Sequence, residues 1–316
     1  ARSLTNTGQL WHKMDRNNEA KQLLDEALAI FTGLVEEYPL FGRYHKELAL
    51  TRCSLAQTLR DLGELSQAEF LLRSALETCR LLAESDKNPE YQELGAVFRS
   101  NLAGVLHQRD QQEEALQEFH TAIQDLRTLA EAHPDMLSYR DELAWSYAYR
   151  GDLLLDMKQP PQAADDYRQV LQLRQQLVKD SPDAEYRYRL AWFLANCQDA
   201  KLRDPAAAIV LAQQAVDLTP NSASYWNALG AAHYRAGHWD DSIRALNEAQ
   251  KRRPEGHCLD WFFLAMAHWQ AGEKQTAQDD CEQGVRWMDI NCPANPEIKR
   301  CRDEVPSQLR PRDSQE

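Results

Sequence analysis

Pairs of adjacent carboxylates are the first residues in this sequence whose type and spacing could do chemistry. Two neighbouring acids can share a proton for general acid–base work, or can hold a cation between them. Here all of the pairs fall near the start or on the outer face of predicted helices, where negative charge complements the helix dipole. We therefore interpret them as solvated helix surface: Glu113-Glu114, Asp165-Asp166, Asp240-Asp241 and Asp279-Asp280.

Histidine and cysteine offer a second kind of chemistry, a zinc site. His257-Cys258 is followed by Cys281, Cys292 and Cys301, so that the gaps between the cysteines are 23, 11 and 9. These gaps match no compact set of zinc ligands. Cys281 also occupies an apolar helical position, where a free thiol behaves as a small hydrophobic group. The sequence therefore predicts no metal ligands.

Catalytic signatures are absent from the sequence. It contains no P-loop, no dinucleotide-binding glycine motif, no nucleophile elbow, no H-E-x-x-H and none of the protein-kinase motifs. His233 and His268 could act as general bases, but they hold equivalent positions where a helical repeat requires a ring, so we expect packed core histidines. We expect no catalytic residue and no cofactor in the chain as given.

A helical repeat explains the positions of most of the remaining residues. In the stretch 223–254, Trp226 is followed by Leu229-Gly230, then by a ring at His233, and then by Ser242, Leu246, Ala249 and Pro254. This spacing resembles the tetratricopeptide repeat, a helix–turn–helix unit of about 34 residues. The resemblance implies a stack of helix pairs with a concave face formed mainly by the first helix of each pair.

The same register recurs along almost the whole chain. Three columns of mostly small residues all advance by 48, 47, 48, 45, 34 and 35 residues, which counts seven units. We therefore predict an all-α fold, an α-solenoid of about seven tetratricopeptide-like units, with elongated helices in the first four. The columns are Gly8, Ala56, Ala103, Gly151, Asn196, Gly230 and Ala265; Ala20, Ala68, Ala115, Ala163, Ala208, Ser242 and Ala277; and Ala27, Ala75, Ala122, Val170, Ala215, Ala249 and Gly284.

The register also divides the chain. We assign residues 1–184 to four long-period units of 47–48 residues and residues 185–290 to three units of near-standard length. Residues 291–306 are predicted to form a turn and a short helix over 296–305, which would cap the open end of the stack because a terminal repeat has no neighbour. Residues 307–316 are predicted to be a disordered tail.

Peptide-binding candidates come from the slots that line the concave groove in proteins with this repeat. These slots hold mainly apolar and aromatic residues in the last three units, which favours an apolar patch for a peptide. Two alternatives are that the superhelix is tight at this point or that the 296–305 helix covers the patch. The candidates are Phe193, Asn227, Tyr234, Phe262, Met266 and Trp269.

One kind of peptide is disfavoured. Tetratricopeptide domains that hold the C-terminal carboxylate of a chaperone use lysine and asparagine on the first helix. The corresponding slots here hold Thr5 and Gln9, Cys53 and Gln57, and Asn227 and Ala231. We therefore expect a protein or peptide partner other than a chaperone tail.

Composition limits the partners and the compartment. The formal net charge of −13 disfavours nucleic acid, because the chain would repel a phosphate backbone. Seven dispersed cysteines without a C-x-x-C pair indicate free thiols in a reducing compartment, so we expect a cytoplasmic location. No apolar run is long enough to cross a bilayer, and no signal peptide is visible.

The stretch 259–300, together with the long-period units before it, resembles the C-terminal repeat region of serine/threonine protein kinases from planctomycete-type bacteria. This resemblance implies a non-catalytic protein-interaction scaffold that recruits partners for, or regulates, a bacterial signalling kinase. One alternative is a fragment of a full-length kinase whose catalytic domain lies upstream of residue 1. Another is a structural oligomerisation module.

Overall fold

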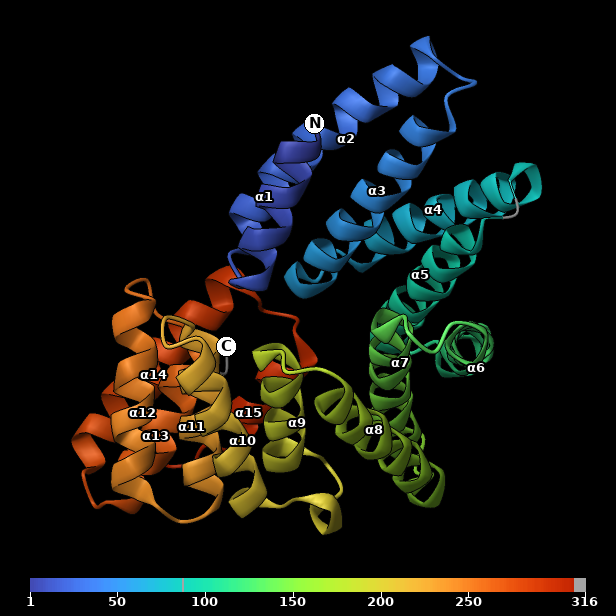
Figure 1. Cartoon of the computed structure of the whole chain (residues 1–316). Coiled ribbons are helices and arrows are strands. Elements are labelled where there is room, and N and C mark those ends of the chain that lie inside the picture. The colour runs from blue at the N-terminus through green and yellow to red at the C-terminus, as the bar shows by residue number, and fades with distance from the viewer. Residues whose placement is uncertain (87, 310–316) are drawn as a thin grey trace. The chain divides into compact units, whose positions relative to one another are not determined.

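Every regular element in the described part of the chain, residues 1–86 and 88–309, is a helix (Figure 1). The computed structural model divides into two compact units, Ala1–Val170 and Leu171–Glu316, and the division falls inside one long helix. Within the described residues, no helix is both long enough and apolar enough to cross a membrane.

The first unit is built from long helix pairs. Apart from α1, its helices have 20 or 21 residues, which confirms the predicted elongation. They are α1 (Arg2–Lys13), α2 (Asn17–Glu37), α3 (Gly42–Leu62), α4 (Leu65–Ser85), α5 (Pro89–Gln108), α6 (Gln112–Ala132), α7 (Leu137–Asp156) and α8 (Pro160–Asp180), the last of which continues into the second unit.

The second unit has shorter pairs. Helices α9 (Ala184–Asn196), α10 (Pro205–Leu218), α11 (Ala223–Arg235), α12 (Trp239–Arg252) and α13 (Cys258–Gln270) have 13 or 14 residues. The 3-10 turn η1 (Ala200–Leu202) separates α9 from α10. The unit ends with α14 (Lys274–Asn291) and the nine-residue α15 (Pro296–Glu304), which is the predicted short final helix.

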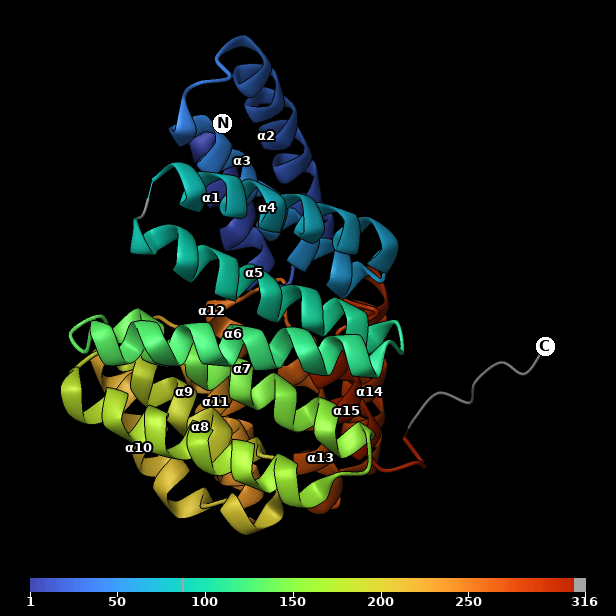
Figure 2. The same ribbon diagram turned by 90° about the vertical axis from the view of Figure 1, so that its right-hand side faces the viewer.

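Each unit has two layers of helices. In the first unit, α1, α3, α5 and α7 each contact the next helix of the same layer, while α2, α4 and α6 pack between successive members (Figure 2). In the second unit, α9, α11 and α13 form the corresponding layer of first helices, and α10 and α12 pack between them. This alternation is the arrangement expected of stacked tetratricopeptide pairs.

Glycine and alanine let the two helices of a pair approach closely. A Cβ added at Gly8 would lie 2.7 Å from Leu24 Cγ, and one added at Gly230 would lie 2.5 Å from Leu246 Cγ. The small residues of the second column, from Ala20 to Ala277, have no exposed surface. The column residues therefore mark the tightest helix–helix contacts, as the register predicted.

The turn between the two helices of a pair also recurs. One residue of the turn has a left-handed backbone, with φ of 54° at Asp15, 87° at Gly63, 62° at Asp110, 59° at Lys158 and 80° at Gly237. Glycine adopts this conformation without steric cost, whereas other residues do not. The left-handed conformation is nevertheless kept where the turn residue is aspartate or lysine, so the packing of the two helices sets the geometry of the turn.

The end of the chain is only partly described. Residues 307–309 belong to the predicted tail, and Leu309 is buried in the core of the second unit. Residues 310–316 lie outside the described residues.

We predict that a residue larger than glycine at position 151 destabilises the fold. A Cβ at this position would lie 2.8 Å from Tyr167 Cε1, so Gly151→Ala should lower the free energy of unfolding by about 1–3 kcal/mol, the usual cost of overpacking. The matched control is Gly33→Ala, where a Cβ meets nothing within 4 Å; it should raise the free energy of unfolding by about 0.5–1 kcal/mol. Urea denaturation followed by circular dichroism measures both changes. Equal effects of the two substitutions would contradict the packing account.

Candidate functional site

Helix α15 forms because the sequence caps both of its ends. The Asn295 side chain accepts hydrogen bonds from the backbone N–H groups of Glu297 and Ile298, both at 3.1 Å. Pro296 holds the first helical position, where a missing N–H costs nothing, and Pro306 follows the last turn. Four residues, 292–295, connect α15 to the end of α14.

One side of α15 is apolar and buried in the core of the second unit. Ile298, Cys301 and Val305 follow the i, i+3, i+7 spacing of one helical face, and at most 7% of each residue is exposed. They belong to the same hydrophobic cluster as Phe263 and Met266 of α13. Burial raises the pKa of the Cys301 thiol, which therefore stays protonated and acts as an apolar group.

Two acidic residues fix α15 to first helices that precede it in the chain. The Trp192 Nε1–H group of α9 donates a hydrogen bond of 2.6 Å to Glu297 Oε1. The guanidinium of Arg235, at the end of α11, lies 2.6 Å from Glu304 Oε2. Since α13 also contacts α15, this helix touches α9, α11 and α13.

An aromatic row connects these anchor points. The ring of Phe263 lies 6.2 Å from the Trp192 ring, nearly edge-on, and 5.8 Å from the Tyr234 ring. Tyr234 in turn contacts Trp239 at 5.4 Å, and the Arg235 guanidinium lies 5.7 Å from the centroids of both Tyr234 and Phe263. We call Trp192, Tyr234, Arg235 and Phe263 the first-helix face.

The sequence left two positions open for the last helix, the end of the stack and the groove formed by the first helices. The contacts of Glu297 and Glu304 place α15 on the first-helix face. Part of the predicted groove of the second unit is therefore covered by the chain itself.

The six groove candidates lie in different surroundings. Tyr234 is half-buried beside α15, and burial raises its pKa. Met266 is buried in the cluster that holds α15, whereas Phe262 is buried against α14, where its ring fills the space left by Gly284. Trp269 is half-buried, and the Lys274 amine lies 5.5 Å from its ring.

The remaining two candidates are buried away from α15. Phe193 packs under the Arg174 guanidinium at 5.4 Å. The side-chain amide of Asn227 donates a hydrogen bond of 2.6 Å to Asp260 Oδ1 of α13, which joins two first helices. Burial raises the pKa of Asp260, and its second oxygen has no partner among the described residues. As a partner-binding set, the six candidates stay a prediction.

Sequence reasoning missed three members of the first-helix face. Phe263 follows Phe262 directly, and Arg235 follows Tyr234, so each lies one place outside the slots that the repeat pattern assigns to the groove. Trp192 precedes the candidate Phe193 directly, and its indole N–H bonds α15. The available signal was the helix at 296–304 itself, whose apolar spacing and flanking acids require a complementary surface.

Two of the carboxylate pairs differ from the prediction of solvated surface. Asp166 is buried and accepts two hydrogen bonds from Arg150, at 2.7 and 2.6 Å. Asp280 is buried and lies 2.6 Å from His268 Nδ1. One member of each pair points toward the first helix of its own hairpin, whereas Asp165 and Asp279 remain exposed. Asp166 and Asp280 therefore join helices, and Asp166 also lines a shallow open pocket together with His120 and Arg150.

Side chains with metal-ligand chemistry meet at the turn between α11 and α12. Ligand atoms of His233, His238 and Asp241 lie within 4.8 Å of one another. Burial lowers the pKa of His233, which favours the neutral ring, but the Asp241 carboxylate already pairs with Arg244. Of the cysteines considered as zinc ligands, Cys258 and Cys292 have sulfurs 3.9 Å apart inside the apolar cluster.

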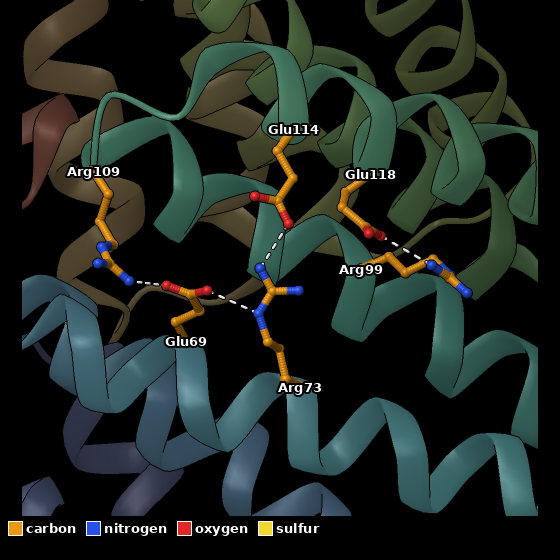
Figure 3. A network of polar contacts seen from close by, with 6 residues as sticks. All are labelled: Glu69, Arg73, Arg99, Arg109, Glu114 and Glu118. Carbon is orange, nitrogen blue, oxygen red and sulfur yellow. Dashed lines mark hydrogen bonds and ion pairs between the residues drawn. The ribbon is translucent and has the colours of Figure 1, made fainter.

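A network of exposed ion pairs crosses the second helices of the first unit (Figure 3). The Arg73 guanidinium of α4 bonds Glu69 at 2.8 Å and reaches Glu114 of α6 at 2.7 Å. Glu69 also pairs with Arg109, which follows α5. Exposed pairs of this kind contribute little each, so the network fixes the alignment of α4 and α6 more than it stabilises them.

The His268–Asp280 pair should make stability depend on pH. The hydrogen bond to Asp280 raises the pKa of His268, so the charged ring stabilises the fold below the ordinary histidine pKa of about 6.5. This stabilisation is lost as the pH rises through the raised pKa. The stability lost in Asp280→Asn, relative to wild type, should therefore be larger at pH 6 than at pH 9 in urea denaturation.

The neighbouring residue gives the control for this pH dependence. Asp279 is exposed, so Asp279→Asn should show little change between the two pH values. Burial of His233 has the opposite pH dependence, but it is common to all three proteins and cancels in the difference. A loss in Asp280→Asn that is the same at both pH values would contradict a charged His268.

Several solved structures are similar to this chain. BtubC from P. vanneervenii is 16% identical, with 74% of this chain and 90% of that chain covered and a TM-score of 0.45. A tetratricopeptide repeat protein from Parabacteroides merdae is 13% identical, with 96% and 97% covered and a TM-score of 0.44. Yeast Tom70 is 13% identical, with 95% and 70% covered and a TM-score of 0.41.

Sequence-family comparison is more specific. No curated protein matches the chain significantly. Family models of the tetratricopeptide repeat match residues 137–183 and, in two overlapping stretches, residues 199–257 and 232–286. Tetratricopeptide repeats are therefore found in α7 and α8 of the long pairs, and in the short pairs from α10 to most of α14, whereas α9 lies outside the matched residues.

Proposed function

We propose that this chain is a non-catalytic scaffold that binds a protein or peptide segment on the first-helix face of its second unit. Tetratricopeptide repeats mediate protein–protein interactions, which supports this class of function. The observation that carries the proposal is the seating of α15, because a separate helix is held there by buried apolar side chains and two polar anchors.

The chemistry of the face favours binding over catalysis. Its polar groups are an indole N–H, a guanidinium and the phenol of Tyr234, and none of them gains or loses a proton near neutral pH. Its other members are aromatic rings, which supply large apolar contact areas with few rotatable bonds. A face of this kind recognises the shape and charge of a helix laid across it.

A peptide selection tests the proposed function. Helical peptides selected from a random library against the full chain should bind the double variant Trp192→Ala/Arg235→Ala at least tenfold more weakly than wild type, because both anchors are removed. Fluorescence anisotropy measures the affinity. The control is Arg244→Ala on α12, whose side chain is exposed and pairs only within its own helix. Peptides that bind all three proteins equally would contradict this location of the site.

We also propose that the scaffold is the recruiting or regulatory part of a bacterial signalling kinase and works in the cytoplasm. The resemblance of residues 259–300 and of the long-period units to the repeat region of such kinases supports the first point. The seven buried free cysteines support a reducing compartment.

The genome of the source organism tests the link to a kinase. We expect the reading frame upstream of Ala1, or the neighbouring gene, to encode a glycine-rich loop with H-R-D and D-F-G motifs. A kinase domain in the same polypeptide would make this chain its regulatory part, whereas a separate kinase gene would make it a recruiting partner. A locus without any kinase would contradict the proposal.

A further inference from the structure

We infer that α15 is a displaceable internal ligand of the first-helix face, and that the partner is a short amphipathic helix, with acids at the two anchor positions, which replaces it. The inference rests on the proposed function, since it names the partner of the same face and the way access to that face is controlled.

The contacts of α15 define what the face accepts. An acid at Glu297 meets the Trp192 indole, apolar residues at Ile298, Cys301 and Val305 enter the cluster, and an acid at Glu304 meets Arg235. The corresponding pattern is acid, apolar, two free positions, apolar, two free positions, acid, apolar. This is a helix-in-groove pattern read at i, i+3 and i+7.

Helix α15 is short, and its apolar side is small for a helix of the core. It has nine residues, fewer than an isolated helix needs to be stable in water, so it depends on docking for its structure. Its central apolar position is a cysteine, which buries less surface than leucine. It remains docked partly because the four-residue connection to α14 keeps its local concentration high.

The face leaves charges that any replacement must satisfy. Only 14% of the Arg235 side chain is exposed beside α15, compared with 39% of Glu304. Removing the partner of a largely buried cation is costly, so a competing helix must supply a carboxylate at the same place. The bond from the Trp192 indole N–H to Glu297 is exposed, so an acceptor there adds to binding but can be replaced by water. A helix with acids at these two positions and leucine at the Cys301 position matches the face and adds apolar contact.

A peptide of this chemistry gives the test. The probe is a labelled synthetic peptide of residues 293–309 carrying Cys301→Leu, titrated by fluorescence anisotropy into the full chain. The loosened chain carries Ile298→Asp and Glu304→Arg in α15, and the matched control carries Asp303→Arg, the same charge reversal at the adjacent exposed residue. We expect the loosened chain to bind the probe at least tenfold more tightly than wild type or the control.

Two further measurements secure the interpretation. Hydrogen exchange of residues 296–304 should be faster in the loosened chain than in wild type. A probe with the Glu304 equivalent changed to arginine should bind the loosened chain at least tenfold more weakly, because two cations then meet at Arg235.

The inference is overturned by any of three results. These are unchanged hydrogen exchange in the loosened chain, equal probe affinity for the loosened and wild-type chains, or a loosened chain that sediments as a dimer, in which a second copy occupies the face. Each of these leaves the library selection free to succeed with peptides of another chemistry. Failure of that selection together with tight probe binding would instead limit the face to its own helix.

Discussion

The close approach of two helices at a residue without a large side chain is the contact on which the rest of the structure depends. Gly8, Gly151 and Gly230 each meet a large residue sixteen positions later in the partner helix. At this distance the two backbones fix the crossing of the pair, and the left-handed turn residues and the next interface follow from it. A repeat protein has no central core, so its order comes from the same contact made again in every unit.

Polar pairs extend this order from one first helix to the next. In the first unit, Gln9 bonds Ser54 at 2.7 Å and Gln57 bonds Asn101 at 2.9 Å, so the spacing of each pair follows the long repeat period. In the second unit, Asn227 bonds Asp260 at the shorter period. Gln9, Gln57 and Asn227 hold slots that the sequence analysis compared with a carboxylate clamp, and here each of them bonds a neighbouring first helix.

The sequence was sufficient for the architecture because small residues leave a periodic record. Three columns with identical spacing indicated the helix pairs, and the extra length of the first four units could only extend helices that were already apolar at helical spacing. The same record does not say which way a ring points. Phe262 looked like a groove residue, but Gly284 lacks a side chain and leaves space that the ring fills. Glu297 and Trp192 are 105 residues apart, and only the folded chain shows that they meet.

The local charge of the first-helix face is opposite to that of the chain as a whole. The net charge is −13, yet the anchors of α15 are a guanidinium and an indole N–H that both bind acids. The net charge therefore predicts long-range repulsion of acidic ligands. The guanidinium and the indole N–H of the face nevertheless attract an acidic side chain once it is in contact. Docking of a helix that is already attached avoids the long-range repulsion.

The four-residue connection before α15 has a consequence for the protein when no partner is bound. A face made of Trp192, Tyr234 and Phe263 would be sticky if left open, since exposed apolar surface promotes association between copies. Residues 292–295 keep α15 attached, so α15 covers the face again within the time of a loop closure. This is far faster than two dilute molecules can meet. Under the proposed function, α15 thus covers the binding surface between binding events and prevents association through it.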